Sequence, residues 1–161
     1  MRGPRQVSVI GSGTCEEGSE AWQLAEEVGG RLADAGAALI CGGLGGVMEA
    51  ASRGAAEAGG TVVGILPGDS LEHANRHCTH VIATGIGHAR NLAVVASGEA
   101  VIAVGGEWGT LSEIGFARRL GRTVVALRSW RAVGEGEMAK APGVVAVATP
   151  AEAVEAALAA S

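Results

Sequence analysis

The chain has 161 residues, of which 48% are hydrophobic and 27 are glycine, and its formal net charge is −5 at neutral pH. That length suits one domain, residues 1–161, with a sizeable core. The acidic balance disfavours nucleic acid as the main partner, and no apolar run reaches the roughly 18 residues of a membrane span, so we expect no membrane partner.

The predicted elements alternate between strands and helices along the chain. Apolar runs predict strands at 7–10, 37–41, 61–66, 80–83, 100–104, 123–127 and 144–147, and helical patterns predict helices at 19–35, 46–58, 87–97, 110–120 and from 149 onward. The segment 131–143 is expected to be a flexible loop. Continuously apolar strands separated by helices favour a parallel sheet covered on both faces. The sequence therefore predicts a Rossmann-like, doubly wound α/β fold with six or seven mostly parallel strands.

Three glycine-rich turns each follow a predicted strand and precede a predicted helix: Gly11-Ser-Gly13, Gly42 to Gly46, and Gly105 to Gly109. In a doubly wound sheet such turns lie at the carboxyl edge, where ligands bind. Glycine lets the backbone approach a phosphate closely, and the start of the following helix supplies free N–H groups. We therefore predict at least one phosphate site, although a short strand-to-helix turn also needs glycine for structural reasons alone.

Two standard nucleotide motifs are absent. The first turn, Gly11-Ser-Gly-Thr-Cys-Glu16, lacks the third glycine of a dinucleotide-binding fingerprint. The second strand ends in Cys41-Gly42, where an NAD site has an acidic ribose ligand. No Gly-Lys-Ser/Thr occurs, so a P-loop is excluded as well.

Several segments resemble one known family. Gly105-Gly-Glu-Trp-Gly-Thr-Leu-Ser-Glu113 resembles the GGxGT-x-x-E signature of the LOG proteins, and Cys41-Gly-Gly-Leu-Gly-Gly-Val-Met-Glu49 is similar to their GGGxxGLM segment. Ile65-Leu-Pro-Gly68 and the arginine of Gly87-His-Ala-Arg-Asn91 follow in matching order. LOG proteins are cytokinin-nucleotide phosphoribohydrolases, often mislabelled lysine decarboxylases. The likeness runs from Val7 to about Leu127, and the nearest branch is the short one that includes the molybdenum cofactor carrier proteins.

The resemblance implies a site and a reaction. Glu113 and Arg90 match the catalytic pair that cleaves the N-glycosidic bond of a nucleoside 5′-monophosphate, giving free base and ribose 5-phosphate. A carboxylate suits this chemistry because the transition state carries oxocarbenium-like charge. The implied phosphate- or nucleotide-binding residues are Gly11, Ser12, Gly13, Gly42, Gly43, Gly45, Gly46, Gly105, Gly106, Gly109 and Thr110. No metal or other cofactor is required, and the family implies a homodimer, for which the small apolar residues of helix 46–58 give some support.

Two departures favour a different function. Hydrolases of the family usually carry proline before the glycine pair and lysine after the arginine, whereas this chain has Val104 and Asn91. These changes favour a carrier that binds a phosphorylated pterin, such as molybdenum cofactor, without turnover. We rank the hydrolase slightly ahead. A pyridoxal-phosphate lysine decarboxylase is excluded, because the single lysine, Lys140, is far from every glycine turn.

Several candidate residues have a second interpretation. Thr110 and Glu113 have the spacing of a capping box, which would explain Glu113 without catalysis. Trp108 is predicted to stack on a flat base or pterin, or to cover a dimer contact, rather than to join the core. His73, His77, Cys78 and His80 match no standard zinc spacing, so we predict no metal site.

The cysteines bear on the compartment. Three cysteines, Cys15, Cys41 and Cys78, lie far apart in the sequence and form no disulfide framework. Because the chain also opens with no secretory pattern, we expect a cytoplasmic protein.

Overall fold

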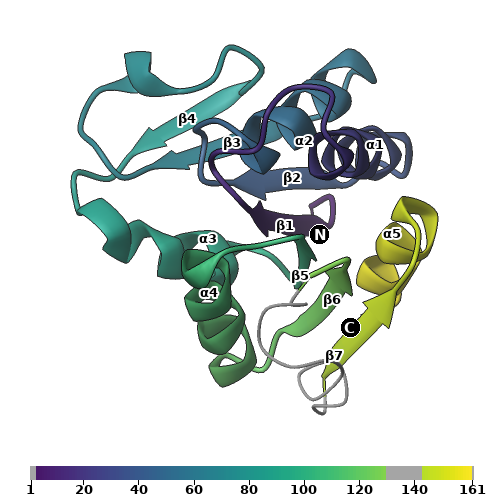
Figure 1. Ribbon diagram of the computed structural model, residues 1–161. Helices are drawn as coiled ribbons and strands as arrows, with labels where there is room; N and C mark the ends of the chain where they lie inside the picture. Colours follow the sequence, from purple (N-terminus) through teal and green to yellow (C-terminus); the bar gives the residue numbers. More distant parts are fainter. Residues whose placement is uncertain (1–2, 130–142, 161) are drawn as a thin grey trace.

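The computed structural model describes residues 3–129 and 143–160, and its centre is one parallel sheet (Figure 1). Within those residues seven strands pair in the order β4-β3-β2-β1-β5-β6-β7, and every pairing is parallel. The strands are β1 (Gln6–Gly11), β2 (Ala38–Cys41), β3 (Val62–Leu66), β4 (His80–Ala83), β5 (Ala100–Val104), β6 (Thr123–Leu127) and β7 (Val144–Val147). The predicted Rossmann-like fold is confirmed, with seven strands. The expected loop 131–143 lies, except for its last residue, outside the described residues.

Helices cover both faces of the sheet (Figure 1). Helices α1 (Glu20–Asp34), α2 (Val47–Glu57) and α5 (Pro150–Ala159) lie on one face, and α3 (Arg90–Ser97) and α4 (Trp108–Arg119) lie on the other. Short 3-10 turns, η1 (Leu71–His73) and η2 (Gly87–Ala89), precede β4 and α3. In the described part of the chain no helix is long and apolar enough to cross a membrane.

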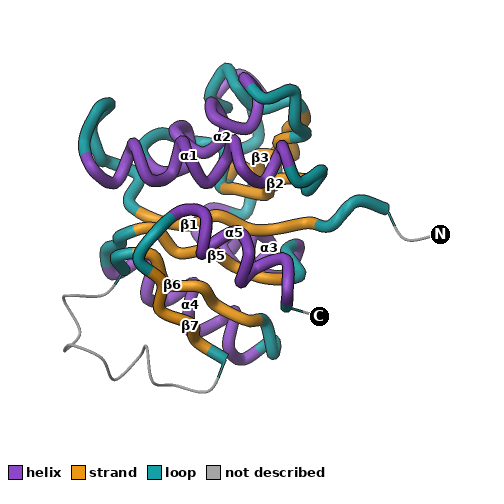
Figure 2. The backbone as a smooth tube through the Cα atoms, turned by 90° about the vertical axis from the view of Figure 1, so that its right-hand side faces the viewer, coloured by secondary structure: helices purple, strands orange, loops and turns teal. Residues whose placement is uncertain are grey.

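The strand order explains where a ligand site can form. The direction in which successive strands are added to the sheet reverses between β1 and β5, because β1 leads to α1 on one face and β5 leads to α4 on the other. The loops at this switch point diverge and leave a crevice at the carboxyl edge. Both termini lie at the opposite edge (Figure 2), where the Arg5 guanidinium donates to the carbonyl of Leu158 at 3.0 Å. The carboxyl edge is therefore free of the chain ends.

Two glycines let α1 and α2 pack in close contact. A Cβ on Gly29 would stand 2.0 Å from the carbonyl oxygen of Ala51, and a Cβ on Gly54 would stand 1.9 Å from that of Glu26. The small apolar residues of α2, including Ala51, are buried against α1 within one chain. These small residues therefore no longer support the predicted homodimer, because packing within one chain explains why they are small and apolar.

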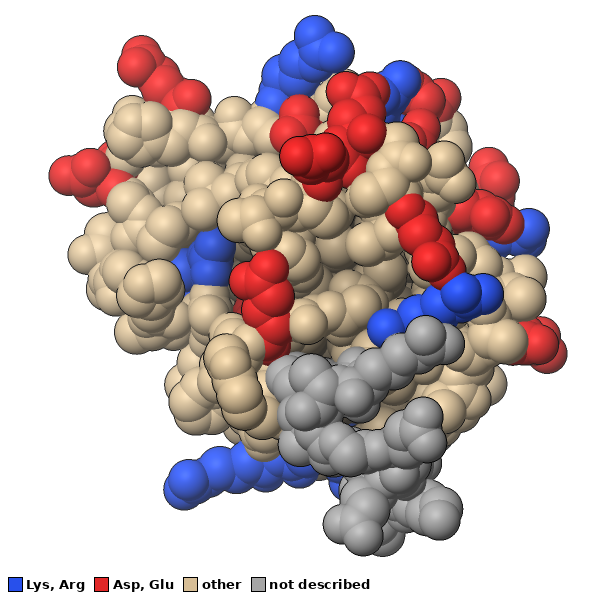
Figure 3. Space-filling view, viewed as in Figure 1, with Lys and Arg blue, Asp and Glu red and all other residues tan. Residues whose placement is uncertain are grey.

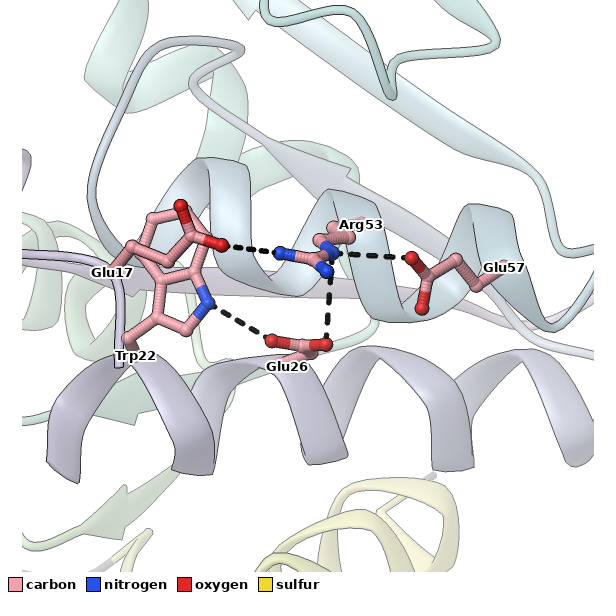
Figure 4. A network of polar contacts seen from close by, with 5 residues as sticks. All are labelled: Glu17, Trp22, Glu26, Arg53 and Glu57. Carbon is pink, nitrogen blue, oxygen red and sulfur yellow. Dashed lines mark hydrogen bonds and ion pairs between the residues drawn. The ribbon is translucent and has the colours of Figure 1, made fainter. Parts of the chain in front are cut away.

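Acidic and basic side chains gather over α1 and α2 on the face shown in Figure 3. Some of them form a polar network centred on Arg53 on the exposed side of this helix pair (Figure 4). The Arg53 guanidinium forms ion pairs with Glu17 at 2.7 Å, Glu57 at 3.1 Å and Glu26 at 3.8 Å. The indole N–H of Trp22 donates to Glu26 at 2.9 Å. Because Glu17 belongs to the β1–α1 loop, this network ties that loop to α2.

Candidate functional site

An open pocket of about 140 Å³ lies at the carboxyl edge, at the switch point between β1 and β5. It is lined by Gly11, Gly13, Met48, Arg90, Asn91, Glu107, Gly109, Thr110 and Glu113. We call it the switch-point pocket. It brings together the β1 loop, the start of α3 and the first two turns of α4, and so places Arg90, Glu113 and part of the predicted glycine set in one pocket.

Arg90 is the first residue of α3, but its side chain points inward and is only 7% exposed. Its Nε donates to the carbonyl of Ile65 at 2.9 Å, its Nη2 donates to the carbonyl of Gly42 at 3.3 Å, and its Nη1 bonds the side chain of Asn91. Burial lowers the pKa of Arg90, while the charge of Glu113 opposes that shift. The guanidinium therefore ties together the ends of β2 and β3 and contributes positive charge to the pocket.

Glu113 lies in the second turn of α4 and is 9% exposed. Burial raises the pKa of its carboxyl group to about 7, and the charge of Arg90 opposes the shift. Within the residues that the structure describes, this carboxyl group makes no hydrogen bond. It is therefore partly protonated at neutral pH and able to exchange a proton with a group in the pocket.

The capping interpretation of Glu113 is wrong. Helix α4 begins at Trp108 with Glu107 as its N-cap, three residues before the predicted cap at Thr110. The Thr110 hydroxyl accepts a hydrogen bond from the backbone N–H of Glu107 at 3.4 Å, so it occupies the third helical position of the capping box. Glu113 is one turn too far along the helix to take part.

Glu107 is the residue that sequence reasoning missed. Its carboxylate accepts hydrogen bonds from the hydroxyls of Ser12 at 2.8 Å and Thr14 at 3.1 Å. An acidic side chain thus occupies the start of α4, where the resemblance implies a phosphate. One signal was available, because two residues separate the glycine pair from Gly109-Thr110, whereas the LOG signature has one.

The second glycine turn has a packing role and does not line the switch-point pocket. A Cβ on Gly46 would stand 2.2 Å from the carbonyl oxygen of Ser12. A Cβ on Gly42 would stand 2.7 Å from Nη2 of Arg90, and one on Gly43 would stand 2.8 Å from the Leu66 side chain. Gly45 has more room, with its nearest neighbour at 3.4 Å. These close approaches explain glycine there without a ligand.

The remaining predicted residues lie around the pocket. Ser12 contacts the pocket by donating a hydrogen bond from its hydroxyl to Glu107, and Gly106 packs on Thr110. Gly105 lines a different pocket on the α1 side. Trp108 is 76% exposed at the first position of α4 and is absent from the core. The described residues contain no group of three or more metal-ligating side chains.

Comparison with known proteins identifies the family. The model of the SLOG cluster4 family matches residues 4–154. The chain belongs to this family. An uncharacterized protein of Archaeoglobus fulgidus is 47% identical to it over 123 residues, which are 76% of this chain and 80% of the relative.

Two solved structures are similar over nearly the whole chain. The molybdenum cofactor binding protein from the phototrophic bacterium Rippkaea orientalis is 33% identical, with a TM-score of 0.86 over 97% of this chain and 96% of that one. The molybdenum cofactor carrier protein of Chlamydomonas reinhardtii is 31% identical, with a TM-score of 0.86 over 99% and 98%. The predicted likeness to LOG proteins near the carrier branch is confirmed.

Proposed function

We propose that this member of the SLOG cluster4 family binds a phosphorylated pterin of the molybdenum cofactor type and holds it without turnover. The observation that carries the proposal is the bonding of Arg90. Its Nε and Nη2 donate to main-chain carbonyls, so the group that a hydrolase would use to hold its substrate is engaged in the fold. This reverses our ranking from the sequence, which placed the hydrolase first.

The similarity to carriers supports the same proposal. Two solved structures that resemble nearly the whole chain, at 33% and 31% identity, are named for binding or carrying molybdenum cofactor. The residue after Arg90 is Asn91, which lines the pocket without adding positive charge. A site that stores a labile cofactor needs donors and shape but no nucleophile or free cation.

The phosphate of such a ligand would bind at the start of α4. This position combines the positive end of the helix dipole with backbone N–H groups, and the hydroxyls of Ser12 and Thr14 add two donors. Gly11, Gly13, Gly109 and Thr110 line the pocket around that point. The phosphate would take over the hydrogen bonds that the Glu107 carboxylate accepts.

A phosphoribohydrolase is the second candidate, and Glu113 favours it. A buried carboxyl group with a pKa of about 7 suits general acid–base catalysis at neutral pH. In that reaction Glu113 would orient the attacking water and stabilise positive charge on the ribose ring. Arg90 would act through its charge alone.

One experiment separates the two functions. The purified protein is mixed with pterin cofactor released from a molybdoenzyme, freed of unbound ligand by gel filtration, and assayed for molybdenum and for fluorescent oxidised pterin. In parallel it is incubated with AMP, GMP, CMP and isopentenyl-AMP, and free base is measured by chromatography. We expect about one pterin per chain and no free base. Release of base that disappears in Glu113→Ala, with no pterin retained, would overturn the carrier proposal.

A further inference from the structure

A second open pocket, of about 160 Å³, lies at the carboxyl edge on the α1 side of the sheet. It is lined by Glu20, Ala21, Leu24, Gly105 and Arg128, and we call it the α1-side pocket. We propose that it binds the heterocyclic ring of the ligand, with Glu20 accepting from the N–H edge of the ring and Arg128 donating to its acceptor edge. This inference rests on the proposed function, because it assigns a place to the ring of the phosphorylated pterin.

The two pockets are close enough for one ligand to occupy both. Gly105 lines the α1-side pocket, and Glu107, two residues later, lines the switch-point pocket. Two residues span at most about 7 Å between Cα atoms. Gly105 and Gly106 have φ values of 57° and 141°, so the backbone turns sharply between the pockets. A ring and a phosphate joined by a few bonds would bridge that turn.

The wall formed by Gly105 and Arg128 is held by hydrogen bonds between neighbouring strand ends. The N–H of Gly105 donates to the carbonyl of Leu127 at 3.1 Å, and the hydroxyl of Ser129 donates to the carbonyl of Gly105 at 2.6 Å. Arg128, with φ of 49°, is the one non-glycine residue with positive φ among those described. Such strain persists where the surroundings hold it and is concentrated at ligand sites. The Arg128 side chain forms an ion pair with Glu20 on α1.

The charges of the α1-side pocket suit a neutral ring better than a phosphate. Glu20 and Arg128 form an ion pair, so the two charges cancel and no net field attracts an anion. Both side chains are exposed, and an ion pair in that setting contributes little stability. A ligand that offers hydrogen bonds to each partner can therefore separate them at small cost.

The chemistry of the lining matches a 2-amino-4-oxo ring such as a pterin. A carboxylate only accepts hydrogen bonds and takes two from adjacent N–H groups, such as those at N3 and the 2-amino group. Arginine donates to ring oxygen and nitrogen acceptors through its planar fork. Ala21 and Leu24 supply apolar surface for the ring face.

The test uses a ring without phosphate and a phosphate without ring. Fluorescence titration measures the binding of 6-hydroxymethylpterin and of 6-hydroxymethyllumazine, which has a carbonyl in place of the 2-amino group. Calorimetry measures the binding of inorganic phosphate. The variant is Glu20→Gln. Its matched control is Glu27→Gln, which removes an exposed carboxylate, paired with Arg31, from the same helix.

We expect the unchanged protein to bind the pterin more tightly than the lumazine. In Glu20→Gln the ratio of the two affinities should fall about tenfold, while the affinity for phosphate stays the same. Glu27→Gln should behave as the unchanged protein. A folding defect would weaken both rings together and leave the ratio intact. An unchanged ratio in Glu20→Gln, with both ring affinities equal to those of the unchanged protein and with the pterin cofactor retained by both proteins, would overturn this inference and leave the proposed function standing. Failure of the unchanged protein to retain the cofactor would instead overturn the proposed function.

Discussion

The hydroxyl of Ser12 donates a 2.8 Å hydrogen bond to the carboxylate of Glu107 and thereby joins the β1–α1 loop to the start of α4. A negative charge is stabilised at this end of a helix by the unpaired N–H groups and the dipole. Glu107 thus uses the interactions that would attract an anionic ligand. The carboxylate and a ligand phosphate therefore compete for the same donors.

Replacing Glu107 with glutamine should strengthen phosphate binding. The amide oxygen still accepts from Ser12, but the variant no longer repels an anion, so we expect about a tenfold gain in affinity at low salt and a smaller gain at high salt. Inorganic phosphate binding is measured by calorimetry, with Glu27→Gln as a control for net charge. Equal or weaker binding in Glu107→Gln would show that phosphate does not bind at the start of α4.

Alanine at Gly54 and at Gly115 should have opposite effects on stability, although both glycines lie within helices. A Cβ on Gly54 would stand 1.9 Å from a backbone oxygen of α1, whereas one on Gly115 would meet nothing within 4 Å. We expect Gly54→Ala to destabilise the fold by about 2–3 kcal/mol and Gly115→Ala to stabilise it by about 0.5–1 kcal/mol. Urea unfolding measures both. Similar midpoints for the two variants would contradict the close packing of α1 on α2.

Much of the fold followed from the sequence because local patterns determine it. Strands such as 100–104 are apolar without interruption, which is the pattern of a parallel sheet buried on both faces. The order of the strands could not be predicted, since it depends on which face each connection covers. The role of the small residues in α2 could not be predicted from the sequence either, because only the structure shows that they face Gly29 and its neighbours on α1.

The site was predicted in part. Arg90 and Glu113 lie in one pocket because loops after parallel strands share one edge of the sheet. Glu107 was missed because Thr110-x-x-Glu113 has the usual spacing of a capping box, whereas Glu107 and Thr110 form the capping box of α4 in the structure. Whether a glycine such as Gly46 serves a ligand or a close backbone approach depends on distances between segments that are remote in sequence.

The predicted homodimer has a candidate surface on α3 and α4. Leu92 of α3, Phe116 of α4 and Leu120, the C-cap of α4, are large apolar side chains that are exposed in the single chain. Phe116 and Leu120 are four residues apart and share one face of the helix. We expect the unchanged protein to be a dimer in gel filtration with light scattering, and Phe116→Ser combined with Leu120→Ser to be a monomer.

The control for this surface is Val145→Ser, which removes an exposed apolar side chain from the edge strand β7. It should leave the dimer intact. A dimer that survives the double substitution would place the interface elsewhere, and a monomeric unchanged protein would refute the homodimer.

The pKa of Glu113 should make stability depend on pH in a direction opposite to that of an ion-paired carboxylate. Burial raises the pKa of this group in the folded protein from the ordinary 4.5 to about 7. Between these two values the folded state keeps the proton and the unfolded state loses it. The free energy of unfolding therefore falls as pH rises through this window, and it levels off above pH 7. Since one pKa unit corresponds to about 1.4 kcal/mol, the loss is about 3 kcal/mol.

Glu113→Gln isolates this contribution, because glutamine keeps the size of the side chain and does not titrate. We expect the variant to match the unchanged protein near pH 4.5 and to be more stable by up to about 3 kcal/mol at pH 8. The measurement is urea unfolding of both proteins at several pH values. Their difference cancels the contributions of the other carboxylates. A difference that stays constant with pH would mean that the pKa of Glu113 is the same in the folded and the unfolded protein, and the proton exchange assigned to it at neutral pH would then be excluded.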